Sequence, residues 1–161
     1  MIRVGILSDT HLHHPDGEFI TRCRSAFASC TAIIHAGDLT SVEILSAFQG
    51  KKVYGVHGNM CNQMTRMTLP EKQQVRLGKF LIGITHGAGP RHNIEERVFD
   101  LFPEADCIIY GHTHQPICHY LGTTLLINPG SFMGTGRYGA PGSYALLTVD
   151  DNGLDGKIFS F

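Results

Sequence analysis

The chain has 161 residues, with 13 Lys and Arg against 14 Asp and Glu, and 10 His. A chain of this length usually forms one domain, and we expect a single domain over residues 1–161. A hydrophobic fraction of 42% argues against intrinsic disorder, and the near-neutral charge gives no nucleic-acid footprint. No apolar run approaches the roughly 20 residues that a membrane span needs.

The N-terminus and the cysteines both favour a cytoplasmic protein. The first apolar stretch is interrupted by Gly5 and followed by Ser8 and Asp9, which is typical of neither a signal peptide nor a transit peptide. The five cysteines form no C-x-x-C pair and are odd in number, so a secreted disulfide framework is a poor interpretation. Ten histidines with almost no net charge indicate metal or acid–base chemistry.

Short runs rich in Val, Ile, Leu or aromatic residues predict buried strands. In chain order the runs are Ile2–Leu7, Ala32–Ile34, Lys52–Val56, Phe80–Thr85, Cys107–Tyr110, Thr124–Ile127 and Tyr144–Val149. Apolar residues at three- and four-residue spacing predict helices within 19–30, 42–48 and 94–102. Residues 73–85 read as a hairpin that turns at Gly78-Lys79. Strand and helix alternate in the front half and strands dominate the back half, which predicts a layered α/β domain with mixed sheets.

Polar residues follow five of these strands. They are Ser8-Asp9-Thr10-His11, His35-Ala36-Gly37-Asp38, His57-Gly58-Asn59, His86-Gly87 and Gly111-His112-Thr113-His114. Ligands of open α/β sheets bind at the carboxyl ends of strands, so we expect these side chains to meet. Imidazole, carboxylate and amide groups suit divalent first-row metals. Seven candidate ligands are too many for one tetrahedral site and suit two octahedral ions that share a carboxylate.

The spacing within two of these segments also fits metal binding. Asp9 and His11, like His112 and His114, are two residues apart, and in an extended chain such side chains share one side. Glycines beside the candidate ligands allow tight turns and close backbone approach. These glycines are Gly37, Gly58, Gly87 and Gly111.

The ordered series resembles the motifs of the calcineurin-like metallophosphoesterases. The matching segments are Asp9-x-His11, Gly37-Asp38, Gly58-Asn59, His86-Gly87 and Gly111-His112-x-His114. The short chain and Asn128-Pro129-Gly130-Ser131 resemble the small bacterial and archaeal phosphodiesterase branch of that family. Each dipeptide alone is weak, whereas the whole series is specific. The resemblance implies a four-layer αββα sandwich of two mixed sheets flanked by helices, with the metal site at the C-terminal ends of the strands.

The resemblance also implies the ligands and the reaction. It assigns one ion to Asp9, His11, Asp38 and His114, and the other to Asp38, Asn59, His86 and His112, with Asp38 as the bridge. The implied enzyme hydrolyses a small phosphodiester, or alternatively a phosphomonoester, with two ions that clamp the phosphate and activate water. Mn²⁺ is the first choice of metal, with Ni²⁺, Zn²⁺, Fe²⁺ or Mg²⁺ as alternatives. A homo-oligomer is an expectation from the family alone.

The chain departs from the family where larger enzymes carry a His that is thought to protonate the leaving group. Asn59 is followed here by Met60, which cannot donate a proton, and by Cys61, a weak donor. His35 and His57 flank the predicted site in sequence and are weak candidates for the acid, with a supporting or structural role as the alternative. Without an acid, we expect leaving groups of low pKa to be favoured.

Two further residues and two other functions stay open. Arg137 is a candidate phosphate contact or a solvated loop residue, and Ser131 either contacts substrate or shapes its loop. Residues 134–139 match G-x-G-x-x-G but lack the flanking strand and helix of a dinucleotide fold. The same fold also serves as a scaffold subunit of a eukaryotic membrane-coat complex, which makes a non-catalytic interaction module the main alternative. A single-metal sensor is a third interpretation, and metal stoichiometry separates the three.

Overall fold

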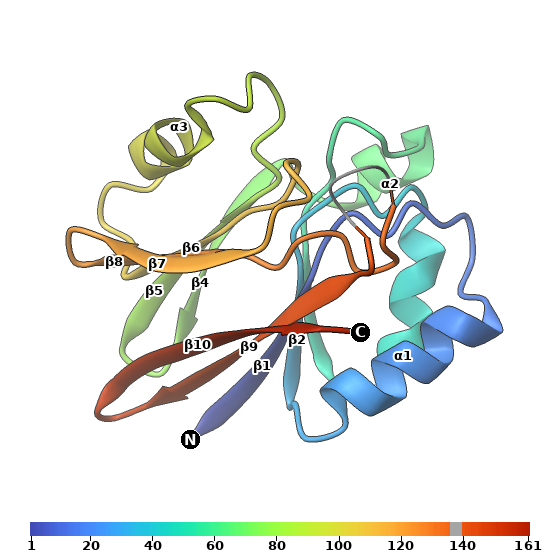
Figure 1. The fold of residues 1–161 in the computed structure, drawn as a ribbon, viewed down its shortest axis with the longest axis horizontal. Coiled ribbons are helices and arrows are strands. Elements are labelled where there is room, and N and C mark those ends of the chain that lie inside the picture. The colour runs from blue at the N-terminus through green and yellow to red at the C-terminus, as the bar shows by residue number, and fades with distance from the viewer. Residues whose placement is uncertain (136–139) are drawn as a thin grey trace.

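The computed structural model describes residues 1–135 and 140–161, and two β-sheets lie face to face at its centre (Figure 1). The first sheet has the order β10 (Gly153–Ser160), β9 (Ser143–Asp150), β1 (Ile2–Leu7), β2 (Ala32–His35), β3 (Lys52–Gly55). The second has the order β4 (Lys72–Leu77), β5 (Phe80–Thr85), β6 (Cys107–Ile109), β8 (Thr124–Asn128), β7 (Ile117–Leu121). Parallel pairs occupy part of each sheet, β1-β2-β3 and β5-β6-β8, and antiparallel strands complete it, so both sheets are mixed as expected.

Helices cover the outer faces and complete the predicted sandwich. Helix α1 (Gly17–Phe27) lies over the first sheet and α3 (Ile94–Leu101) over the second (Figure 1). The 3₁₀ helix η1 (Val42–Phe48) and α2 (Gln63–Thr68) lie on the same side as α1. Helix α1 begins where the Asp16 carboxylate accepts the Phe19 N–H at 2.8 Å, which satisfies one amide that the first turn leaves without a partner.

Three hydrophobic cores hold these layers together. The central core packs the facing sides of the two sheets, with Ile6 and Ile34 from one and Ile82 and Ile109 from the other. A second core lies beneath α1 and η1, and a third beneath α3. Because these residues alternate along each strand with residues of the outer cores, both sheets are packed on both faces. The strand ends that carry the polar motifs therefore rest on a closely packed base.

The sequence interpretation missed or misjudged four elements. Residues 42–48 form a 3₁₀ helix where the periodicity predicted an α-helix. Helix α2 has six residues, too few to show a helical period. Strands β7 and β10 were not among the predicted runs because they are edge strands without a fully buried residue, and β10 contains Gly156 and two charged residues instead of an apolar run. The predicted hairpin is confirmed, with Leu77 opposite Phe80.

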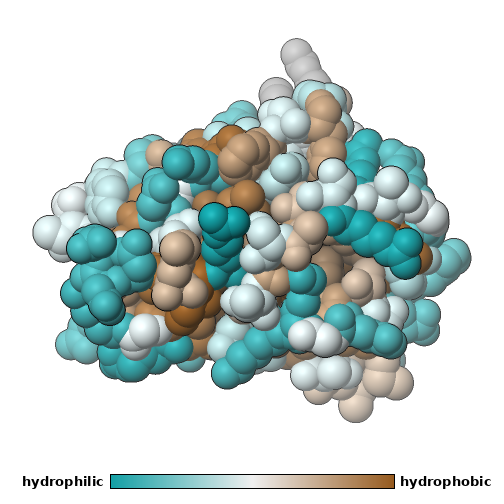
Figure 2. All heavy atoms as spheres, turned by 90° about the horizontal axis from the view of Figure 1, so that it is seen from below, coloured by the Kyte–Doolittle hydropathy of each residue, from teal (hydrophilic) through white to brown (hydrophobic). Residues whose placement is uncertain are grey.

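The surface mixes polar and apolar residues. Figure 2 shows one face on which hydrophilic side chains are spread widely, with smaller hydrophobic areas between them. Within the parts of the chain that the structure describes, no helix is both long and apolar enough to cross a membrane.

Candidate metal centre

The polar strand ends meet at one edge of the two sheets, as the sequence predicts. They form two clusters, and within each cluster the potential ligand atoms lie within 4.8 Å of one another. The first cluster is Asp9, His11 and His114, and the second is Asp38, His86 and His112. The membership parallels the two ligand sets that the family resemblance implied.

The backbone of these segments is not extended, which corrects one step of the sequence argument. Asp9, His11, His112 and His114 all have positive φ, between 51° and 70°. Such left-handed residues turn the chain sharply at the strand ends. Asp9 and His11 still reach the same cluster, but His112 and His114 diverge into different clusters. The i, i+2 pair of histidines therefore spans the two clusters, in agreement with the ligand sets that the resemblance implied.

Glycines let the backbone pass close to the carboxylates. A Cβ on Gly58 would lie 2.2 Å from Oδ1 of Asp38, and one on Gly111 would lie 2.7 Å from Oδ2 of Asp9. Both distances are far below normal contact, so no larger residue fits at either position without displacing a carboxylate. The expectation of close backbone approach is confirmed at these two turns.

Asp9 is fully buried and surrounded by donors. Its Oδ2 accepts from Ser8 Oγ at 2.6 Å and from the His112 N–H at 3.1 Å, while its Oδ1 lies 3.1 Å from Nε2 of His114. Burial acts to raise the pKa of Asp9, but the His114 hydrogen bond and the imidazole charges outweigh it and hold that pKa below its usual value. The carboxylate is therefore ionised and ready to bind a cation.

Asp38 and His86 form the core of the second cluster. Nε2 of His86 lies 3.1 Å from Oδ2 of Asp38 and 3.9 Å from Oδ1 of Asp9, yet it is buried without a well-aligned hydrogen bond. Burial lowers the pKa of His86, but the two carboxylates and the Ala36 carbonyl outweigh it and raise the pKa overall. A buried nitrogen that faces two carboxylates without a hydrogen bond is in the position of a metal ligand.

Backbone carbonyls orient three of the imidazoles. Nδ1 of His86 lies 2.8 Å from the Ala36 carbonyl, Nε2 of His112 lies 2.9 Å from the Gly89 carbonyl, and Nδ1 of His114 lies 3.0 Å from the Thr135 carbonyl. A carbonyl only accepts, so each of these nitrogens carries a proton, and the opposite ring nitrogen is the one that can offer a lone pair to a cation. This is the support that metal-binding histidines usually have. The donor set fits divalent first-row metals.

Asn59 stands at the rim, in a turn that the chain holds firmly. The turn is fixed by the Met60 N–H, which donates to Oδ1 of Asp38 at 2.7 Å, and by Nη2 of Arg66, which donates to the Asn59 carbonyl at 2.7 Å. Asn59 and His86 line a cavity of 420 Å³ together with His57. The Met60 side chain is 59% exposed, and its thioether has no proton to donate to a leaving group.

The other predicted residues have different outcomes. His35 is wrong as an acid candidate, because it is fully buried and both ring nitrogens are used, Nδ1 by the Gly37 N–H and Nε2 by the Thr10 hydroxyl. Burial lowers the pKa of His35 to about 3, so its ring is neutral. Of the two alternatives for Ser131, the structure favours the loop-shaping one, because the side chain is fully buried and donates to the Asp9 carbonyl at 2.9 Å. Arg137 lies outside the described residues.

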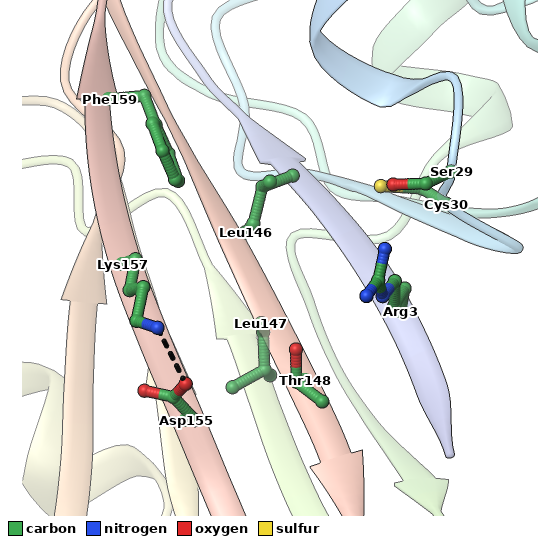
Figure 3. Close-up of a pocket in the computed structure, with 9 residues that line it drawn as sticks. All are labelled: Arg3, Ser29, Cys30, Leu146, Leu147, Thr148, Asp155, Lys157 and Phe159. Carbon is green, nitrogen blue, oxygen red and sulfur yellow. Dashed lines mark ion pairs between the residues drawn. The ribbon is translucent and has the colours of Figure 1, made fainter.

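A second cavity lies on the outer face of the first sheet, away from these clusters (Figure 3). It measures 200 Å³, and Leu146 and Phe159 contribute apolar walls. Lys157 pairs with Asp155 at 3.1 Å, but both side chains are largely exposed, so this ion pair contributes little stability. The cavity contains none of the residues predicted for the site.

Comparison with known proteins agrees with the geometry. Residues 2–152 match the family model described as the calcineurin-like phosphoesterase superfamily domain. The chain belongs to this family. A probable metallophosphoesterase from Methanothermobacter thermautotrophicus is 35% identical over 158 residues, which cover 96% of this chain and 90% of that protein. A phosphodiesterase from Methanocaldococcus jannaschii is 25% identical, over 83% of this chain and 86% of that one.

The same sandwich fold also occurs in a protein whose name is not that of a phosphoesterase. The solved structure of Vps29 from Entamoeba histolytica, complexed with Zn²⁺, is 21% identical, has a TM-score of 0.73 and covers 99% of each chain. At this identity the likeness shows the fold alone.

Proposed function

We propose that the chain is a two-metal phosphodiesterase, with Mn²⁺ as the first choice of ion and Ni²⁺, Zn²⁺, Fe²⁺ or Mg²⁺ as alternatives. The observation that carries the proposal is the pair of adjoining clusters, in which the buried Nε2 of His86 lies close to the carboxylates of Asp9 and Asp38 without a hydrogen bond. Both carboxylates have lowered pKa values, although burial alone would raise them. The phosphodiesterase names of several relatives support the choice of a diester.

When bound, two ions supply positive charge for the phosphate oxygens and lower the pKa of a water molecule between them. The chain's task is to hold them in place. Asp9, His11 and His114 would hold one ion, while Asn59, His86 and His112 would hold the other, with Asp38 shared. Backbone carbonyls accept a proton from the rings of His86, His112 and His114, so these three rings would enter the centre with their orientation already set.

The site lacks an evident proton donor for the leaving group among the residues considered from the sequence. Met60 has no ionisable group, and His35 is buried with both nitrogens engaged. His57 lines the cavity beside Asn59 and is the remaining candidate from the sequence. We therefore propose that the enzyme prefers diesters whose leaving group has a low pKa, because such a group departs without a protein acid.

The test compares bis-p-nitrophenyl phosphate with the monoester p-nitrophenyl phosphate. The protein is stripped of metal and then supplied with Mn²⁺, Ni²⁺, Zn²⁺ or Mg²⁺, with Asp38→Asn as the matched variant. We expect metal-dependent diester cleavage that exceeds monoester cleavage, and a fall of about 10²-fold or more in the variant, because a shared carboxylate places both ions. Folded protein that is inactive with every ion refutes the proposal.

A second candidate is an interaction module on the same fold. The observation that favours it is the exposed Met60 where catalysis needs a proton donor, together with the likeness to Vps29 structures. The complete donor set weighs against it, because an interaction surface does not require two clusters of oriented imidazoles. Turnover of the diester would decide for the enzyme.

A further inference from the structure

The loop between β5 and α3 touches two members of the second cluster. It begins with His86, and its Gly89 carbonyl accepts the Nε2 proton of His112 at 2.9 Å. Gly87 and Gly89 both have positive φ, 82° and 121°, so the loop follows an irregular path instead of a regular element. The position of His112 therefore depends on what holds this loop.

Arg97 of α3 holds the loop between β5 and α3 in place. Nη1 donates to the Ala88 carbonyl at 3.1 Å, and Nη2 donates to the Gly87 carbonyl at 3.0 Å and to the Pro90 carbonyl. The half-buried side chain lines the 420 Å³ cavity beside His86. A guanidinium carries several donors in a fixed plane, so it can bind several carbonyls at once, whereas the ammonium of Lys is a single point.

We propose that Arg97 is a positioning residue for the second ion of the centre. The inference rests on the proposed two-ion function. Arg97 fixes the carbonyls on either side of Gly89, and Gly89 receives the Nε2 proton of His112. Nδ1 of His112 is thereby left with its lone pair for the second cluster, to which His112 belongs.

The first cluster is held by other hydrogen bonds, so losing Arg97 should affect the second cluster selectively. Nδ1 of His114 donates to the Thr135 carbonyl at 3.0 Å, and Ser131 donates to the Asp9 carbonyl at 2.9 Å. The contacts of Arg97 go to its own helix start and to the 87–90 loop. Loss of the guanidinium should therefore weaken the second ion and spare the first.

The test is a metal titration that needs no turnover. Arg97→Lys keeps the charge and removes the planar fork, and Arg97→Gln is a second variant in case the first misfolds. The matched control is Arg76→Lys, which loses a carbonyl bond of 3.1 Å to Lys79 in the β4–β5 turn. Each metal-free protein is titrated with Mn²⁺ by calorimetry, coupled ion pairs are counted by electron paramagnetic resonance, and melting temperatures report folding.

We expect two ions in the wild type and in the Arg76 control. In the Arg97 variants the second ion should bind about 10–100-fold more weakly, the usual cost of losing a group that orients a ligand, while the first is unchanged. Two ions bound with wild-type affinity by the Arg97 variants would overturn the inference, as would equal weakening of both ions. A wild type that binds one ion refutes the two-ion function itself, and the inference with it, before any variant is compared.

Discussion

Gly58→Ala tests how tightly the backbone constrains the Asp38 carboxylate, which we propose is shared by the two ions. The new Cβ would lie 2.2 Å from Oδ1 of Asp38, 2.7 Å from the Asp38 nitrogen and 2.7 Å from Cδ2 of His86. Normal contact is about 3.5 Å, so a movement of roughly 1 Å is needed, and the Asp38 main chain obstructs it. The φ of Gly58 lies outside the left-handed region, so the cost is steric alone.

Overpacking of this kind costs about 1–3 kcal/mol, which corresponds to a fall in melting temperature of roughly 2–10 °C for a chain of this size. A shift of about 1 Å in a group that places the ions should lower kcat on bis-p-nitrophenyl phosphate by roughly 10²-fold. The matched control is Gly17→Ala at the start of α1, where a Cβ meets nothing within 4 Å and stability should hold or rise slightly. Wild-type melting, metal binding and turnover in Gly58→Ala would refute this reasoning.

Three further predictions test other parts of the site. Ser131→Ala should cost about 1–3 kcal/mol and lower kcat with KM unchanged, because the hydroxyl supports Asp9 and not substrate; a change in KM alone would contradict this. The folded pKa of His35, about 3, lies below its unfolded value, so its contribution to stability is present above pH 6.5 and is lost as pH falls, by about 1.4 kcal/mol per pH unit. Denaturant unfolding at several pH values should show that the unfolding free energy of His35→Asn depends less steeply on pH than that of the wild type. Met60→His should accelerate cleavage of diesters with poor leaving groups more than that of bis-p-nitrophenyl phosphate, and an unchanged ratio would show that the acid is not limiting.

Much of the fold was predictable because its strands are buried. Runs such as Ile2–Leu7 and Phe80–Thr85 carry apolar residues for both faces, and the structure confirms them as β1 and β5. Strands β7 and β10 lie at sheet edges and contain no fully buried residue, so no continuous apolar run marks them in the sequence. Short helices such as α2 depend on a cap, here the Asn62 side chain that accepts the Thr65 N–H, more than on periodicity.

The ligand types and their order along the chain were readable from the sequence, because polar residues that follow buried strands meet at one sheet edge. The sequence alone also indicated the family and the unusual Met60. Tertiary structure decided the rest. It gives the ligand segments their left-handed backbone, buries His35 and Ser131, and orients three imidazoles, those of His86, His112 and His114, by carbonyls from distant segments. Backbone carbonyls are common to every residue, so no side-chain pattern could reveal which of them would face a histidine.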